Sequence, residues 1–476
     1  MKRAAILLAG PLALLATVWL PAPAAIGEPA WRVAGLAVWM ALWWLSAVVP
    51  LEATAVLPLV MLPLVGDRPF EAIATTYADP VIFLFLGGFL IAAALQRWEL
   101  HRRFAYVALR AVGASPRRIL LAFLLTTAFL SMWISNTATA VMMLPIAAAT
   151  VSRRGAGPDD RDGFAIATML AVAFGASIGG VATLIGTPPN AIFVANAREL
   201  AGTTFTFASW LPVGLALAVP LLAACWGILI VLFRVPASFP PGAEPMMPPE
   251  RRPLEPGERF VLAVFALAAL GWVLRTPKQL GAVRVPGLTD LLPGLSDPAV
   301  GLLAALVLFA VPLPRSRFHT GLDWDTARKI PWGILLLFGG GITLAAAFES
   351  SGLSSWIGGR LEGIAGLPFP LLIAATVTVF ILLTELTSNT ATAALAMPIM
   401  AGVAEGIGVP PVPMMLAAAL ACSMAFMLPV ATPPNAIVFG QGGMRIGDMA
   451  RAGVVLDAVA VVAITAVVSL WTLMTA

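Results

Sequence analysis

The sequence is poor in charged residues, cysteine and histidine. Of 476 residues, 11% are charged, two are cysteines and two are histidines, whereas 60% are hydrophobic. This composition lies outside that of soluble domains and predicts a helical protein that crosses a membrane several times. Cys225 and Cys422 lie in apolar runs, so we expect core residues there and neither a disulfide framework nor a metal site. His101 and His319 lie in polar connections, away from any cluster with transition-metal spacing.

Three short motifs occur twice within apolar sequence. Ser-Asn-Thr-Ala-Thr-Ala follows Ile134 in the first copy and Thr387 in the second. At the same offset, a Gly-Gly pair opens the apolar runs 87–95 and 340–348. In a third pair, Thr-Pro-Pro-Asn-Ala-Ile follows Gly186 and Ala431. The chain is therefore a duplicated membrane unit whose hydrophobic segments are interrupted by small polar groups at matching places. Such interruptions indicate a transporter's binding site, because backbone freed from a helix at membrane depth must be buried or line a wet cavity.

The fold class that we expect is an all-α polytopic membrane protein with two inverted-topology repeats. We expect about eleven transmembrane helices plus two re-entrant hairpins, at about 119–151 and 370–403, with the Ser-Asn-Thr motifs at their tips. Pro-Pro-Asn should break the spans at about 164–197 and 412–439, because proline removes a backbone donor. The remaining spans are expected near 4–20, 32–50, 51–66, 79–96, 208–233, 259–275, 298–313, 331–349 and 452–475. The predicted order is an N-terminal helix in 1–30, a first repeat in 31–234, a proline-rich linker in 235–257 and a second repeat in 258–476.

The distribution of basic residues predicts the topology. With the N-terminus inside and the C-terminus outside, 21 of the 28 basic residues fall on the inner side. The basic stretch 97–118 is suited to lying on the inner surface in contact with membrane lipid, and its counterpart 350–371 has a single arginine, Arg360. Topology thus explains the net charge of +4 without a nucleic-acid partner. We expect a bacterial inner membrane as the location. Lys2, Arg3 and the apolar run after them also resemble a cleavable signal peptide, although an uncleaved helix is favoured.

The Ser-Asn-Thr motifs combine two kinds of binding group. At a hairpin tip, N-terminal helix ends carry partial positive charge and bind carboxylates, and hydroxyl and amide groups add directional hydrogen bonds. Free carbonyls, hydroxyls and the asparagine side-chain oxygen suit Na⁺. Two copies favour a ligand with two anionic ends, such as a dicarboxylate. For one isolated motif, simple hydrogen bonding between helices would be the preferred interpretation, but the matched duplication favours a binding site.

Other polar residues near the motifs leave more than one interpretation open. Ser131 and Thr384 each lie four residues before a motif serine, so they are candidate cation ligands or residues that bond the preceding helical turn. The Thr-Pro-Pro-Asn segments are candidate ligand segments or proline kinks. The acids Glu52, Asp79 and Glu349 lie near apolar segments and are functional hypotheses. For Glu385, a structural hydrogen-bonding role is favoured over proton coupling, because the first motif has no matching acid.

These motifs resemble those of the divalent anion:sodium symporter family, over nearly the whole chain. The resemblance rests on the paired Ser-Asn-Thr and Pro-Pro-Asn motifs, on the run from Asp79 to Phe89 and on Thr384–Thr390. It implies a homodimer with a scaffold domain and a transport domain that moves as an elevator. It implies one sodium site at Ser131, Ser135, Asn136 and Gly186, and a second at Thr384, Thr387, Asn389 and Ala431. It implies that substrate carboxylates meet Ser135, Asn136, Thr137, Thr187, Ser388, Asn389, Thr390, Thr432 and Pro433.

The function expected is secondary active transport that couples inward Na⁺ movement to uptake of the C4-dicarboxylates succinate, malate or fumarate. The alternatives are an Na⁺-independent dicarboxylate exchanger and an Na⁺-coupled sulfate or tricarboxylate carrier, which hydroxyls and helix ends would serve equally well. A membrane enzyme is disfavoured because both histidines lie in connections on the inner side, away from the motifs. A sensor is disfavoured because no soluble signalling domain is evident.

Overall fold

The computed structural model describes residues 2–23, 26–66, 68–113, 115–151, 162–239, 253–280, 283–360, 363 and 366–475. The chain is mostly helical. Its first part forms α1 (Lys2–Trp19), α2 (Glu28–Ser46), α3 (Leu51–Thr54), α4 (Leu57–Leu64), α5 (Phe70–Ala74), η1 (Thr75–Ala78), α6 (Pro80–Arg97) and α7 (Leu100–Val112). After two hairpin helices and a broken helix described below, α12 (Phe207–Leu232), α13 (Pro256–Leu274), α14 (Asp297–Ala310), α15 (Trp324–Ala327), α16 (Trp332–Ser351), α17 (Leu353–Gly359) and α22 (Ile446–Thr475) complete the main helices.

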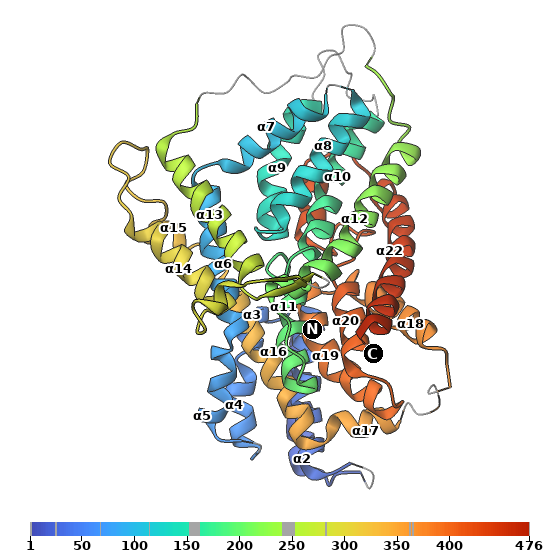
Figure 1. Cartoon of the computed structure of the whole chain (residues 1–476). Coiled ribbons are helices and arrows are strands. Elements are labelled where there is room, and N and C mark those ends of the chain that lie inside the picture. The colour runs from blue at the N-terminus through green and yellow to red at the C-terminus, as the bar shows by residue number, and fades with distance from the viewer. Residues whose placement is uncertain are drawn as a thin grey trace.

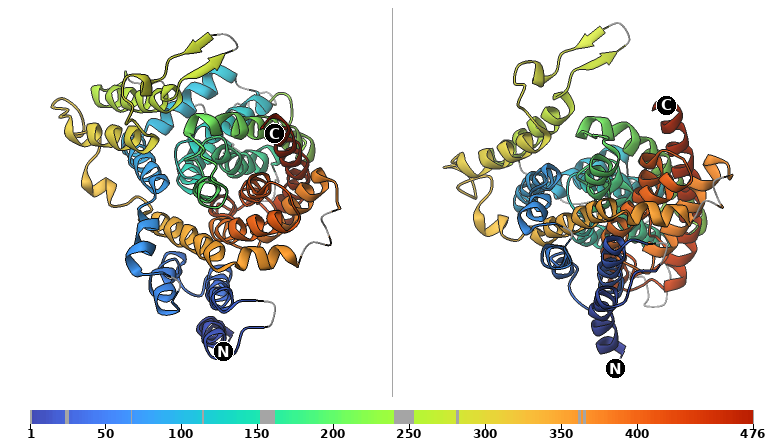
Figure 2. Two further views of the ribbon diagram at one scale, coloured as in Figure 1. Left: turned by 60° about the horizontal axis from the view of Figure 1, so that its bottom comes forward. Right: turned by 90° about the horizontal axis from the view of Figure 1, so that it is seen from below.

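Six helical segments of the described residues are long and apolar enough to cross a membrane. They are Phe70–Arg97, Gly163–Val181, Phe207–Leu232, Pro256–Leu274, Trp332–Ser351 and Ile446–Thr475, and six shorter apolar helices accompany them. Between α13 and α14, strands β1 (Lys278–Leu280) and β2 (Val283–Val285) pair antiparallel, with Lys278 opposite Val285. This small hairpin projects from the helical body, followed by the short helix η2 (Leu288–Asp290) (Figure 2).

Each Ser-Asn-Thr motif starts the second helix of a helical hairpin. The first hairpin is α8 (Pro116–Ser131) and α9 (Asn136–Val151), and the second is α18 (Phe369–Thr384) and α19 (Asn389–Gly406). Ser388 has extended backbone angles, so the new helix begins at the asparagine. The first hairpin occupies the upper half of the molecule in Figure 1 and the second the lower half, so their tips approach each other from opposite ends.

Each Pro-Pro-Asn segment starts the second half of a broken helix. α10 (Gly163–Val181) is followed by α11 (Pro188–Ala201), and α20 (Pro411–Ala421) by α21 (Pro433–Gly440). Two prolines at the first helical positions lack N–H groups that would have no intrahelical partner there, so they favour a helix start. Thr187 and Thr432 precede them in the same extended conformation, with φ of -142° and -138°.

The two halves of the chain pack across one another in the centre of the molecule. α10 is buried along almost its whole length, as is α20. α9 of the first half packs against α21 of the second, and α11 of the first half packs against α19 of the second. Figure 2 shows α13 and α14, in yellow, at one flank of this central body. Breaks from both halves therefore meet in one place.

The structure differs from the sequence-based expectation at 51–66. That segment forms α3 and α4 with a turn at Ala55 and Val56, where a single span was predicted. The prolines at 50, 58 and 63 favour short helices there. Residues 240–252 of the predicted linker lie outside the described residues, as do the inner-side arginines at 153, 154 and 161.

Candidate binding site

A cavity of about 570 Å³ lies where the two hairpins and the two broken helices meet. The first residues of four helices line it: α9 at Asn136, α11 at Pro188, α19 at Asn389 and α21 at Pro433. All of the predicted substrate residues line this one cavity, namely Ser135, Asn136, Thr137, Thr187, Ser388, Asn389, Thr390, Thr432 and Pro433. Segments far apart in sequence thus contribute to one polar chamber.

The cavity has the electrostatics of an anion site made without cationic side chains. Among the described residues that line it, none is basic, and the sole charged one is Glu52. Each helix N-terminus carries roughly half a positive charge, so four of them offer about two charges to a bound anion. α9 and α19 also present N–H groups of their first turns, which have no intrahelical partner. At α11 and α21 the prolines remove such donors, and the threonines before them supply hydroxyl groups instead.

Ser131, Asn136 and Gly186 come together beside the first hairpin tip. The Ser131 hydroxyl lies 2.7 Å from the side-chain oxygen of Asn136 and 2.7 Å from the backbone oxygen of Ala176. A side chain at Gly186 would come within 2.4 Å of the Gly180 carbonyl and 2.9 Å of the Ser131 carbonyl, so only glycine allows this approach. Several hard oxygen atoms close together fit a small monovalent cation.

Thr384 and Asn389 repeat this arrangement beside the second tip. The Thr384 hydroxyl lies 2.7 Å from the side-chain oxygen of Asn389 and 3.0 Å from the backbone oxygen of Cys422. Ala431 lines the cavity nearby. The Thr387 hydroxyl is instead engaged with the Leu383 carbonyl at 2.7 Å and with Thr392 at 2.6 Å. The Thr387 hydroxyl therefore faces its own hairpin and not Asn389.

Two buried asparagines of the Pro-Pro-Asn motifs were not among the predicted site residues. Asn190 donates to the Gly180 and Thr183 carbonyls at 3.2 and 2.8 Å, and Asn435 donates to the Ala425 and Leu428 carbonyls, both at 3.0 Å. Each amide bridges two carbonyls of the unwound segment and fixes its shape. The duplication of the motif was a sufficient signal to find both residues.

A second group of lining residues comes from helices outside the motifs. Trp44, Ser46 and Ala47 end α2, Glu52 begins α3, and Ile334 and Leu337 belong to the start of α16. Ala47 takes a left-handed conformation, with φ of 49°, where α2 stops. Sequence reasoning singled out Glu52 as an acid in apolar surroundings but assigned none of these residues to the site. Their side chains close one wall of the cavity.

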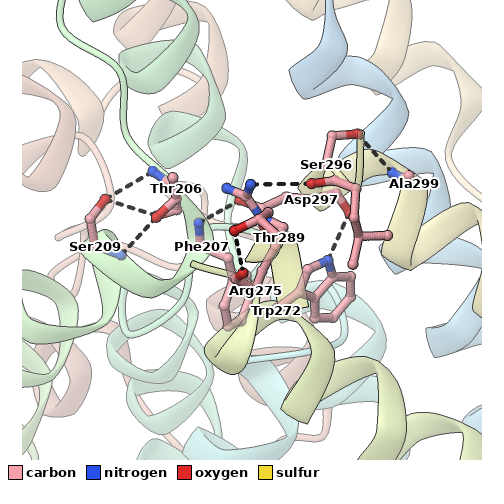
Figure 3. Close-up of polar contacts among 10 residues, drawn as sticks. Thr206, Phe207, Ser209, Trp272, Arg275, Thr289, Ser296, Asp297 and Ala299 are labelled. Atoms are coloured by element: carbon pink, nitrogen blue, oxygen red, sulfur yellow. Dashed lines mark hydrogen bonds and ion pairs between the residues drawn. The ribbon is translucent and has the colours of Figure 1, made fainter. Parts of the chain in front are cut away.

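Two buried acids connect neighbouring helices away from the cavity lining. Asp79 caps α6, accepting from the Val81 N–H at 2.8 Å, and forms an ion pair with Arg198 of α11. Asp297 at the start of α14 forms an ion pair with Arg275 and accepts from the Phe207 N–H of α12 at 2.9 Å (Figure 3). Both carboxylates are buried and paired, so Asp79 has a structural partner that its sequence context did not reveal.

Glu385 takes the hydrogen-bonding position that was favoured for it. Its carboxylate accepts from the Met427 and Leu428 N–H groups at 2.7 and 3.0 Å, in the unwound segment between α20 and α21. Within the described part of the chain, no group of three or more His, Cys, Asp or Glu residues could hold a metal ion. The oxygen clusters beside the two hairpin tips consist of hydroxyl, amide and backbone oxygens.

The chain matches known transporters over nearly its full length. The family model described as "Sodium:sulfate symporter transmembrane region" matches residues 2–476. The sodium-dependent dicarboxylate transporter SdcS of Staphylococcus saprophyticus is 36% identical over 474 residues, covering 97% of this chain and 90% of that protein. SdcS of Staphylococcus aureus strain RF122 is 36% identical over 473 residues, with the same coverage.

Two solved transporter structures share the fold. The YdaH transporter of Alcanivorax borkumensis has a TM-score of 0.59 at 13% identity, and the match covers 94% of this chain and 98% of the YdaH chain. MtrF of Neisseria gonorrhoeae, which represents a class of antimetabolite efflux pumps, has a TM-score of 0.57 at 14% identity. The match covers 96% of this chain and 97% of the MtrF chain. At these identities the likeness concerns the fold alone.

Proposed function

Because the chain belongs to the divalent anion:sodium symporter family, we propose that it couples inward Na⁺ movement to uptake of C4-dicarboxylates such as succinate, malate and fumarate. The family and the SdcS relatives are transporters, so this chain is an integral membrane transporter and not an enzyme. The relatives' names support both the sodium ion and the dicarboxylate, and the matched region covers 97% of this chain.

The observation that carries the proposal is the meeting of four helix N-termini in a cavity whose described lining has no basic residue. A ligand with two carboxylates places one near Asn136 and the other near Asn389, where the hairpin helices offer free N–H groups and hydroxyls. Dipoles and hydroxyls bind an anion without the desolvation cost of a buried arginine.

Sodium coupling is supported by the oxygen clusters behind the same asparagines. The side-chain oxygen of Asn136 faces Ser131, and that of Asn389 faces Thr384. The same asparagines also line the cavity. A cation bound behind an asparagine would fix its side chain and the helix start beside the substrate, so binding of Na⁺ and of the dianion would favour each other.

The proposed architecture is a homodimer whose protomer has two inverted repeats, about eleven spans and two re-entrant hairpins. In each protomer, the hairpins, broken helices, α12 and α22 form the transport domain, and the other spans form the scaffold. We place the N-terminus inside and the C-terminus outside a bacterial cytoplasmic membrane. The cavity wall made by α2, α3 and α16 supports an elevator-type movement, because the transport domain would have to slide past it.

The decisive experiment is uptake of radiolabelled succinate into proteoliposomes with an inward Na⁺ gradient, compared with the same gradient of K⁺. We expect succinate uptake with the Na⁺ gradient and none with the K⁺ gradient. Equal uptake that requires vesicles preloaded with dicarboxylate would identify an exchanger and overturn Na⁺ coupling. Absence of succinate uptake, with Na⁺-driven uptake of sulfate or citrate, would replace the substrate class.

A further inference from the structure

Two carboxylates lie side by side in the interior, away from the cavity lining. Glu385 follows Thr384 at the end of α18 and is 1% exposed. Asp457 belongs to α22, which packs against α18, is 6% exposed and places its carboxyl beside that of Glu385. Neither oxygen of Asp457 receives a hydrogen bond. Two adjacent buried carboxylates repel one another unless a positive charge joins them.

The packing of α22 explains how Asp457 reaches this position. Gly453 lies against the unwound segment between α20 and α21, where any side chain would come within 2.4 Å of the Phe426 carbonyl. Asp457 follows four residues later, so it occupies the same face of α22, one turn further along. The glycine allows α22 to approach closely, and the aspartate is thereby brought to Glu385.

The first half of the chain has the same packing without the acids. Gly214 of α12 lies against the corresponding unwound segment, where any side chain would come within 2.5 Å of the Ala182 carbonyl. Four residues later stands Ala218, and the residue after Ser131 is Met132. There the Thr183 hydroxyl donates to the Met132 carbonyl and connects the unwound segment to the hairpin.

The comparison of the two halves shows that the two acids are not needed to form the hairpin, the helix break or the close glycine contact. Where the second half has Glu385 and Asp457, the first half has Met132 and Ala218, and both halves form a hairpin, a break and a close glycine contact. Glu385 fixes the unwound segment through the Met427 and Leu428 N–H groups, as Thr183 does in the first half. Asp457 has no such task, and within the described residues neither acid forms an ion pair with a basic side chain.

We propose that Glu385 and Asp457 form a third Na⁺ site, next to the second oxygen cluster and absent from the first half. The oxygens of Asp457 and the carboxylate of Glu385 are hard ligands for such a cation. Since Glu385 adjoins Thr384 and holds the unwound segment, the third ion also stabilises the shape of the second site. The proposal rests on the Na⁺ coupling proposed above and adds one ion to it.

The test is saturation binding of ²²Na⁺ to the purified full-length protein, together with the ratio of ²²Na⁺ to labelled succinate taken up by proteoliposomes. Asp457→Asn is expected to bind one Na⁺ fewer per protomer than the wild type and to carry one fewer per succinate. Asp457→Ala, which introduces the residue of the first half, and Glu385→Gln are expected to show the same loss. Asp448→Asn is the matched control, because Asp448 lies on α22 and accepts from the Arg445 N–H at 2.9 Å, away from the pair.

The outcomes are distinguishable from failure of the proposed function. A wild type that binds no Na⁺ overturns both Na⁺ coupling and the third site. A wild type and an Asp457→Asn variant that bind the same number of ions overturn the third site alone. Proton uptake with succinate that disappears in Asp457→Asn, with unchanged Na⁺ binding, assigns the pair to a proton and also overturns it. If the wild type binds Na⁺ but takes up no succinate, the loss of one bound ion in the variant still supports the site.

Discussion

The Thr384 hydroxyl lies 2.7 Å from the side-chain oxygen of Asn389, the same distance that joins Ser131 to Asn136 in the first half of the chain. Each hydroxyl belongs to the helix that enters a hairpin tip, and each asparagine begins the helix that leaves it. The pair therefore connects the carbonyl end of one helix to the amide end of the next. A cation would bind at the first end and an anion at the second.

Removal of either hydroxyl is expected to weaken Na⁺ binding. Ser131→Ala or Thr384→Ala loses an oxygen ligand worth about 1.5 kcal/mol, which corresponds to a roughly tenfold rise in the Na⁺ concentration for half-maximal uptake. Ser131→Thr and Thr384→Ser keep the hydroxyl and serve as controls. Succinate uptake titrated with Na⁺, with choline as the replacement cation, measures the effect. An unchanged Na⁺ dependence in the alanine variants would remove both residues from the sites.

Truncation of the motif asparagines is expected to abolish transport while the protein remains folded. Asn136→Ala and Asn389→Ala each remove a side chain that faces both the cavity and a hydroxyl partner. Asn196→Ala is the control, since Asn196 is a buried asparagine of α11 that lies outside the cavity lining and donates to the Ile192 carbonyl at 2.6 Å. Uptake should be compared at equal amounts of monodisperse protein. Wild-type uptake in either motif variant contradicts the site.

A close helix contact at one end of the molecule predicts a large effect from a single methyl group. A side chain at Gly402 of α19 would come within 2.4 Å of the Ser354 carbonyl on α17. Gly402→Ala is therefore expected to destabilise the fold by about 1–3 kcal/mol, because backbone must move. Gly227→Ala on α12 meets nothing within 4 Å and should be neutral or stabilising by up to about 1 kcal/mol. Denaturation in micelles tests the contrast, which equal effects would refute.

We expect the buried His101 to make the folded protein less stable in mild acid. It is buried on the amphipathic helix α7, and burial, helped by the Arg102 charge, lowers its pKa from 6.5 to about 4. Above pH 6.5 the imidazole is neutral in both the folded and the unfolded chain. Between pH 6.5 and 4 the unfolded chain binds a proton that the folded one does not, so stability decreases as the pH falls through this window.

The measurement for His101 is the unfolding midpoint between pH 7 and pH 4. His101→Gln is expected to flatten the decrease, whereas His319→Gln, a substitution at an exposed loop position, should leave it unchanged. If both variants retain the wild-type slope, other groups carry the acid sensitivity.

Local sequence accounts for the helix breaks and for the cavity residues that flank them. Ser388 and the prolines after Thr187 and Thr432 determine where helices start, and these starts line the cavity. Contacts between distant helices could not be predicted in this way. Many apolar helix faces can pack against one another, so the sequence alone does not say which two helices meet. The ion pair of Asp79 with Arg198, the approach of Asp457 to Glu385 and the cavity wall at Trp44 and Glu52 all depend on such packing.

The crossed packing of α9 on α21 and of α11 on α19 bears on how such a protein arose. Each half of the chain contains two of the four helix N-termini that line the cavity, and therefore only one side of it. An ancestor of half this length could have enclosed a substrate only as a pair of copies inserted in opposite directions across the same membrane. In the proposed inverted-repeat architecture, joining the two copies in one chain would fix the orientation of each and free the halves to diverge, as the acids at 385 and 457 illustrate.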